Sequence, residues 1–94
     1  MAPDLAEKTD RYERLLSEAL AAVEESDVDT TGLDATADDL EEMAAAYLAD
    51  GRHFREEGDL VNALAAFAYG HAWLDAGARL GLFAVPEEGH LFTV

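Results

Sequence analysis

Apolar residues recur at helical spacing in three stretches of this chain, and more polar segments separate them. The first stretch runs from residue 4 to 25, the second from 37 to 57 and the third from 59 to 83. Between the last two, Gly58 supplies a helix stop and Asp59 supplies the next N-cap. We therefore expect the second and third helices to form an αα-hairpin with a very tight turn.

The segments outside these stretches have no apolar period. Residues 26–36 are polar and contain a glycine, which predicts a loop, and residues 84–94 predict an irregular tail. Thr36 and Asp39 have the spacing of a helix cap, which places the start of the second helix. The pattern as a whole predicts an all-α fold, an up-down-up three-helix bundle in a single domain spanning residues 1–94.

The third stretch is apolar on two sides. On a helical wheel, one face and the nearly opposite face each carry large side chains. The first face holds Leu60, Leu64, Phe67, His71, Leu74, Ala78 and Leu82, and the second holds Asn62, Tyr69, Trp73, Ala76 and Leu80. A three-helix bundle buries only one broad face of its third helix, so the second face is surplus. Either the C-terminal tail folds over it or another chain does.

This surplus face gives the main functional expectation. We expect a non-enzymatic interaction module that forms a homodimer, or docks a small protein partner, through the third helix. The interface residues would be Asn62, Tyr69, Trp73 and Leu80.

The charge of the chain indicates which classes of partner it can bind and the salt concentration in which it works. The 94 residues include 21 acidic and 6 basic side chains, for a net charge of −15, yet half of the chain is hydrophobic. An acidic surface with a single lysine is typical of halophilic adaptation, since molar salt screens like charges; an ordinary acidic bacterial protein is the alternative. The charge argues against nucleic acid and anionic membranes as partners. Without cysteines, a long apolar run or an N-terminal apolar segment, we expect a cytoplasmic protein.

Two stretches resemble a known family. The segment YLADGRHF, and then GDLVNALAAFAYGHAWLDAGARLGLF, are similar to the archaeal family catalogued as domain of unknown function 357. The matching positions are Gly58, Asp59, Ala63, Tyr69, His71, Leu74, Asp75 and Ala76. The resemblance implies a three-helix bundle in a haloarchaeal member of that family, and it implies no activity. Gly51 departs from the pattern, where alanine is expected, at a cost of roughly 1 kcal/mol in helix propensity.

Two polar groups could carry chemistry. His71 and Asp75 lie one turn apart on the third helix, as a structural hydrogen-bonded pair or as the centre of a small hydrolase or ligand-binding site. No nucleophile or third metal ligand accompanies them, so we assign no catalytic residue, no metal and no cofactor.

The loop from residue 27 to 38 resembles a calcium-binding EF-hand loop. Asp27, Asp29, Thr31 and Asp38 stand at ligand positions and a glycine stands at position six. An apolar position is occupied by Asp34, and the last ligand is a short aspartate instead of glutamate. Calcium binding and a solvated loop both remain as interpretations.

Overall fold

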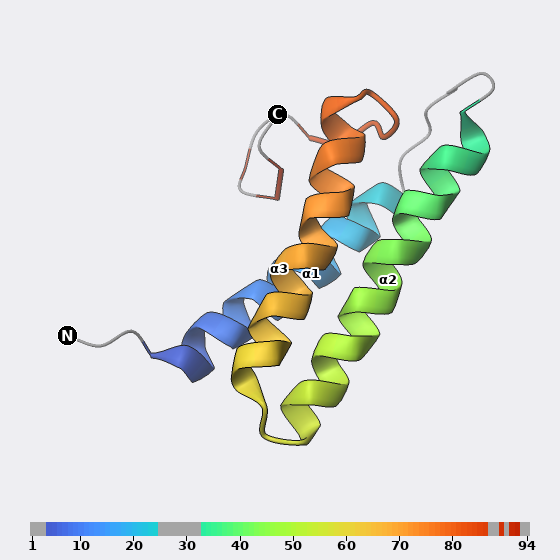
Figure 1. Cartoon of the computed structure of the whole chain (residues 1–94). Helices are drawn as coiled ribbons and strands as arrows, with labels where there is room; N and C mark the ends of the chain where they lie inside the picture. The colour runs from blue at the N-terminus through green and yellow to red at the C-terminus, as the bar shows by residue number, and fades with distance from the viewer. Residues whose placement is uncertain (1–3, 25–32, 87–88, 90, 93–94) are drawn as a thin grey trace.

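A computed structural model of the chain describes residues 4–24, 33–86, 89 and 91–92. Within those residues it contains three α-helices and no strand: α1 (Leu5–Glu24), α2 (Asp34–Glu56) and α3 (Leu60–Arg79). The helices run up, down and up; α2 and α3 lie side by side, and α1 crosses behind them (Figure 1). This is the three-helix bundle that the sequence predicts.

Asp4 caps the start of α1. The side-chain oxygen Oδ1 of Asp4 accepts the backbone N–H of Glu7 at 3.1 Å. One turn on, Thr9 is fully buried, and its hydroxyl donates to the carbonyl of Leu5 at 2.7 Å. The hydrogen bond satisfies a polar group that would otherwise be costly to bury, so Thr9 can pack inside the bundle.

The second helix begins at Asp34, earlier than the predicted residue 37. Leu33 occupies the N-cap without a side-chain hydrogen bond, and its carbonyl accepts the N–H of Ala37 at 2.9 Å. The predicted cap at Thr36 is therefore wrong. The additional turn buries Ala37 in the core and places the carboxylate of Asp34 at the positive end of the helix dipole, and both effects favour the earlier start.

Two glycines in the left-handed conformation end α2 and α3 in the same way. At Gly58, with φ of 79°, the N–H of Asp59 bonds to the carbonyl of Phe54 at 2.9 Å. At Gly81, with φ of 77°, the N–H of Leu82 bonds to the carbonyl five residues back, also at 2.9 Å. Both are Schellman motifs, which need a residue that tolerates positive φ. The tight turn predicted at Gly58 is confirmed.

The second Schellman motif corrects the end of the third helix. It was predicted to reach Phe83, but it ends at Arg79 because Gly81 reverses the chain. The reversal brings the ring of Phe83 against Gly77, where a Cβ atom would overlap it. Stopping α3 early therefore lets Phe83 return to the core, where it is buried.

Glycines and alanines bring α3 very close to its neighbours. The ring of Phe67 on α3 lies against Gly51 on α2 so closely that a Cβ there would overlap the ring. A Cβ on Gly70 would stand 2.8 Å from Cβ of Tyr47 and 2.9 Å from Cδ2 of Leu16. The departure of Gly51 from the family pattern thus has a steric reason, because alanine would not fit beneath Phe67.

The buried line of α3 is consequently rotated from the one that large residues predict. It runs through Ala63, Ala66, Phe67, Gly70, Leu74, Gly77 and Ala78. Leu64 and His71, predicted on the buried face, are half-buried at its edge. The line of closest contact between α3 and the other helices runs along its smallest side chains. The solvent side of α3 is therefore rotated from the predicted one by the same amount as the buried side.

Candidate interaction surface

The solvent side of α3 is a continuous stripe that we call the outer face. It consists of Val61, Asn62, Ala65, Ala68, Tyr69, Ala72, Ala76, Arg79 and Leu80, all of them exposed. Val61, Tyr69 and Leu80 are 66%, 53% and 73% exposed, respectively. Arg79 is the one charged residue of this stripe. Large apolar groups are therefore held in water on the helix that carries the fewest charges.

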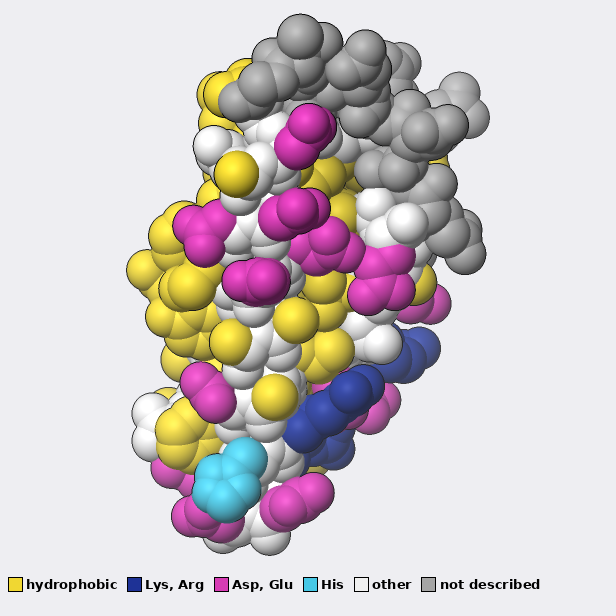
Figure 2. All heavy atoms as spheres, turned by 90° about the vertical axis from the view of Figure 1, so that its right-hand side faces the viewer, with side chains coloured by type: hydrophobic (Ala, Val, Ile, Leu, Met, Phe, Trp, Pro, Cys, Tyr) yellow, Lys and Arg dark blue, Asp and Glu magenta, His cyan; other side chains and the backbone are white. Residues whose placement is uncertain are grey.

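The outward side of α2 shows what the rest of this molecule presents to solvent. Asp38, Asp39, Glu42, Asp50 and Glu56 are all exposed there. Figure 2 shows carboxylates distributed along this side, with the arginines gathered toward one border in the lower half. The outer face of α3 thus differs from its neighbour in charge rather than in secondary structure.

Aromatic side chains join the outer face to α2. The ring of Tyr69 meets that of Tyr47 edge to face, with centroids 4.7 Å apart and planes at 81°. It also meets Trp73 at 6.0 Å and 88°. Edge-to-face pairs of this kind are each worth about 0.5–1.5 kcal/mol beyond their buried area. They fix the ring of Tyr69 while leaving half of it in water, so the residue is preorganised for contact.

The four predicted interface residues divide into three kinds. Tyr69 and Leu80 are exposed as expected. Trp73 is half-buried against the core, and its Nε1–H is buried with no hydrogen-bond acceptor among the described residues. Asn62 is exposed, but its amide donates to Asp59 Oδ2 at 2.6 Å, which places it in the N-cap of α3. Sequence reasoning missed Val61, Ala65, Ala68 and Ala72, because a wheel drawn from large residues misplaces the solvent side.

His71 makes its hydrogen bond with the C-terminal tail. Its Nε2 lies 2.5 Å from the carbonyl oxygen of Leu91, and its ring stacks on Phe92 with centroids 6.1 Å apart. Phe92 is buried with the core. Leu91 and Phe92 therefore lie on the His71 side of α3, and Tyr69 and Leu80 are exposed. The predicted pair of His71 with Asp75 stays a prediction.

A model of the protein family of unknown function DUF357 matches residues 11–83 of the chain. The chain belongs to the DUF357 family. The match covers all of α2 and α3 and most of α1, and it ends at Phe83, before the tail. No curated protein and no solved structure matches the sequence. Among the described residues of this DUF357 chain, no helix is long and apolar enough to cross a membrane.

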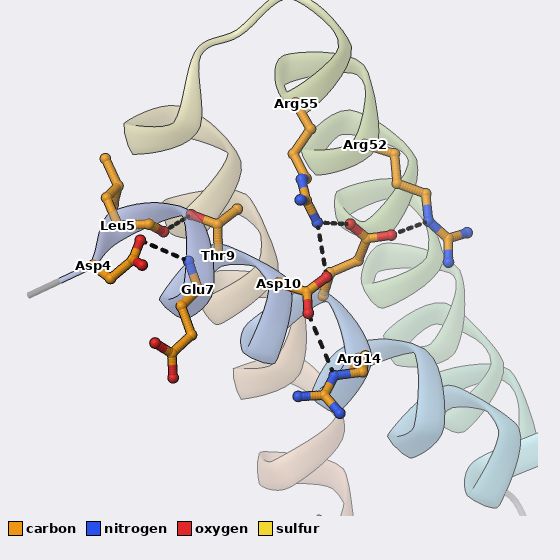
Figure 3. Close-up of polar contacts among 9 residues, drawn as sticks. Asp4, Leu5, Glu7, Thr9, Asp10, Arg14, Arg52 and Arg55 are labelled. Atoms are coloured by element: carbon orange, nitrogen blue, oxygen red, sulfur yellow. Dashed lines mark hydrogen bonds and ion pairs between the residues drawn. The ribbon is translucent and has the colours of Figure 1, made fainter.

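The seam between α1 and α2 in the DUF357 chain is built from ion pairs. Figure 3 shows Arg52 and Arg55 reaching from α2 toward carboxylates on α1. Arg55 Nη1 donates to Glu13 at 2.7 Å and to Asp10 at 3.4 Å, and Arg52 Nε donates to Glu13 at 3.1 Å. The hydrogen bond that Arg55 donates to Glu13 is the main cause that raises the pKa of Arg55 above its ordinary value. These contacts tie the start of α1 to the end of α2.

Toward the opposite end of the DUF357 bundle, the helices carry many acidic residues and few basic ones. No lysine or arginine occurs between Arg14 and Arg52. Burial, and then the negative charges of Glu24 and Asp38, raise the pKa of Glu41. The carboxylates at this end therefore crowd one another, and the molecule is polarised along its length. Five of its six cations, Lys8, Arg11, Arg14, Arg52 and Arg55, lie on the first half of α1 and the last turns of α2.

The calcium interpretation gains nothing from the described residues. Asp27, Asp29 and Thr31 lie outside them, and Asp38 is exposed within α2. In the part of the chain that the structure describes, no group of three or more His, Cys, Asp or Glu could hold a metal ion. The calcium site of residues 27–38 is therefore not carried further.

Proposed function

We propose that this DUF357 protein is a non-enzymatic interaction module that self-associates through the outer face of α3. The observation that carries the proposal is the contrast in charge: a 20-residue helix presents large apolar side chains to solvent with one charge among them, in a chain of net charge −15. Apolar surface of this kind is costly in water and marks contact sites on soluble proteins. Tyr69, held by two ring contacts, would be a central anchor.

Charge also favours a second copy over other occupants. Two copies that met through the outward side of α2 would oppose carboxylates with carboxylates, which costs several kcal/mol. A basic partner would be drawn to those carboxylates and not to α3. The outer face of α3 suits a partner surface that is itself apolar and nearly uncharged, and this chain carries such a surface.

We further propose that the module is adapted to high salt. With 21 acidic and 6 basic residues, two copies repel at long range in dilute buffer. At molar salt the Debye length falls to about 3 Å, so this repulsion vanishes while apolar contact persists. Association should therefore strengthen as salt is raised, the opposite of an interface built on ion pairs.

The decisive experiment is the mass in solution, measured by size exclusion with light scattering in molar potassium chloride. We expect a dimer for the wild type. Ala72→Glu places a carboxylate at the centre of the outer face and should raise the dimer Kd at least about tenfold. Trp73→Glu is less suitable than the sequence suggests, because Trp73 packs on the core and its loss would disturb the fold.

Ala45→Glu is the matched control. Ala45 is also an exposed helical alanine, but it lies on the acidic outward side of α2. The substitution adds the same charge in the same secondary structure and should leave the dimer intact. A wild type that stays monomeric at high micromolar concentration, or equal effects of the two substitutions, would refute the proposed function.

A further inference from the structure

The side chains on the outer face of α3 are complementary to those of the same face when the helix direction is reversed. Its large end residues, Val61 and Leu80, lie at opposite ends of the stripe. Reflection about a point between Gly70 and His71 exchanges these two positions. The same reflection exchanges Ala65 with Ala76, Tyr69 with Ala72, and Asn62 with Arg79. The ninth residue, Ala68, exchanges with Trp73, which is half-buried beside the stripe, so an alanine again faces a ring.

The position of the stripe alone does not produce this match. Any exposed stripe on a helix maps onto itself when it is reversed, but the side chains that then meet are unconstrained. Here large apolar groups meet at both ends, one alanine pair meets between them, and the rings of Tyr69 and Trp73 each meet an alanine near the centre. The bundle already uses a ring over a small residue, since Phe67 lies on Gly51. A twofold interface requires this kind of self-complementarity, because residue i contacts residue j and j contacts i.

We infer that the second copy packs antiparallel, with α3 against α3 and Val61 of each copy beside Leu80 of the other; the inference rests on the proposed function. Small residues along the centre allow the two helix axes to approach closely. The 20 residues of α3 make a contact about 30 Å long, with its apolar anchors at both ends and Tyr69 near the middle.

The distribution of charge favours the same orientation. Five of the six cations lie toward the end of the bundle where α2 turns into α3. The acidic stretch between Arg14 and Arg52 reaches the other end, where Arg79 is the remaining cation. A parallel pair would bring the two acidic ends together. An antiparallel pair places the cation-bearing, less negative end of one copy beside the more acidic end of the other, so the two copies repel less than in a parallel pair.

Site-directed cross-linking tests the orientation, because the natural chain has no cysteine. Val61→Cys and Leu80→Cys each introduce one thiol at an exposed position. Within one helix these positions are about 28 Å apart, beyond the reach of a short bismaleimide. The antiparallel pairing predicts little covalent dimer from either variant alone. An equal mixture of the two should give at least about tenfold more, because docking raises the effective thiol concentration.

The outcomes separate this inference from the proposed function. Leu80→Cys that cross-links to itself as well as the mixture does would indicate a parallel pair and overturn the inference. A noncovalent dimer by light scattering with no cross-link in the mixture would also overturn it, and would leave self-association standing. Monomeric mass for the wild type would refute both. Circular dichroism of each variant checks that the helices are retained.

Discussion

The seam between α2 and α3 and the seam between α1 and α2 join the same helix to its neighbours by different forces. At the first, a ring rests on Gly51 and the backbone at Gly70 nearly touches Tyr47. At the second, Arg52 and Arg55 bridge to carboxylates at 2.7–3.4 Å. The first contact is steric and short-ranged. The second is electrostatic and partly exposed to solvent, so ionic strength acts on it directly.

This difference indicates how the bundle responds to change. Steric fit fails when one atom is added, but salt does not alter it. Partly exposed ion pairs tolerate rearrangement and contribute little, about 0–1 kcal/mol each. The hairpin of α2 and α3 should therefore behave as the rigid part of the molecule, and the docking of α1 should be the part that solvent adjusts.

Removing salt should have the largest effect. At about 0.01 M ions the Debye length reaches about 30 Å, so the net charge of −15 opposes the compact state throughout, even though individual ion pairs strengthen. We expect most helical circular dichroism to be lost on dialysis into dilute buffer. Trimethylamine oxide favours burial without screening charge. If it restores the helices as fully as potassium chloride does, charge repulsion is not the cause.

The second-largest loss of stability should follow from adding one methyl group where α2 packs against α3. Gly51→Ala gains about 1 kcal/mol in helix propensity, but its Cβ would overlap the ring of Phe67. Overpacking of this kind costs about 1–3 kcal/mol, so we expect a net loss in the free energy of unfolding. Chemical denaturation at fixed high salt measures it. The double variant with Phe67→Leu should show favourable coupling; purely additive losses would remove the steric explanation.

Removing ion pairs between α1 and α2 should lower the stability by less. Arg55→Met keeps the length of the side chain and removes its contacts with Glu13 and Asp10, for an expected loss of about 0.5–1 kcal/mol at moderate salt. The loss should shrink in molar potassium chloride. Arg11→Met is the control, since Arg11 pairs with Glu7 within α1 at 3.8 Å and both side chains are mostly exposed. An equal loss in both variants would mean that the seam has no special role.

The smallest effect should come from the crowded carboxylate at the acidic end. The pKa of Glu41 is raised, so the folded chain binds this proton more tightly than the unfolded chain. Its ionised form weakens the fold above the folded-state pKa, and the penalty is relieved as pH falls toward 4.5. Glu41→Gln should stabilise the protein at neutral pH by less than about 0.5 kcal/mol and flatten this dependence. Glu42→Gln, an exposed neighbour, serves as the control in thermal melts.

Features encoded by neighbouring residues could be predicted from the sequence, and features set by distant contacts could not. The turn at Gly58 and the N-cap at Asp59 depend on residues within a few positions, and both were predicted. The early stop of α3 was missed because Gly81 resembled the other small residues of that helix. Its role as a stop becomes visible only with Phe83 folded back onto Gly77.

The candidate surface was predicted only in part, because it too depends on contacts between distant residues. Tyr69 and Leu80 were assigned correctly to the solvent side. Trp73 was placed too far outward, because the closest packing of α3 follows glycines and alanines that carry no hydrophobic signal of their own. The ion pairs of Arg55 link residues 42 and 45 positions apart, which no local spacing indicates.

The position of Trp73 gives the molecule a built-in optical reporter. It is the only tryptophan of the chain, and its indole N–H is buried with no acceptor in the part of the chain that the structure describes. Emission from an indole shielded from water lies at shorter wavelengths than that of an exposed one, and Tyr69 stands 6.0 Å away as an energy donor. The fluorescence of the unlabelled protein should therefore change on unfolding. It should also change when a contact excludes water from Tyr69.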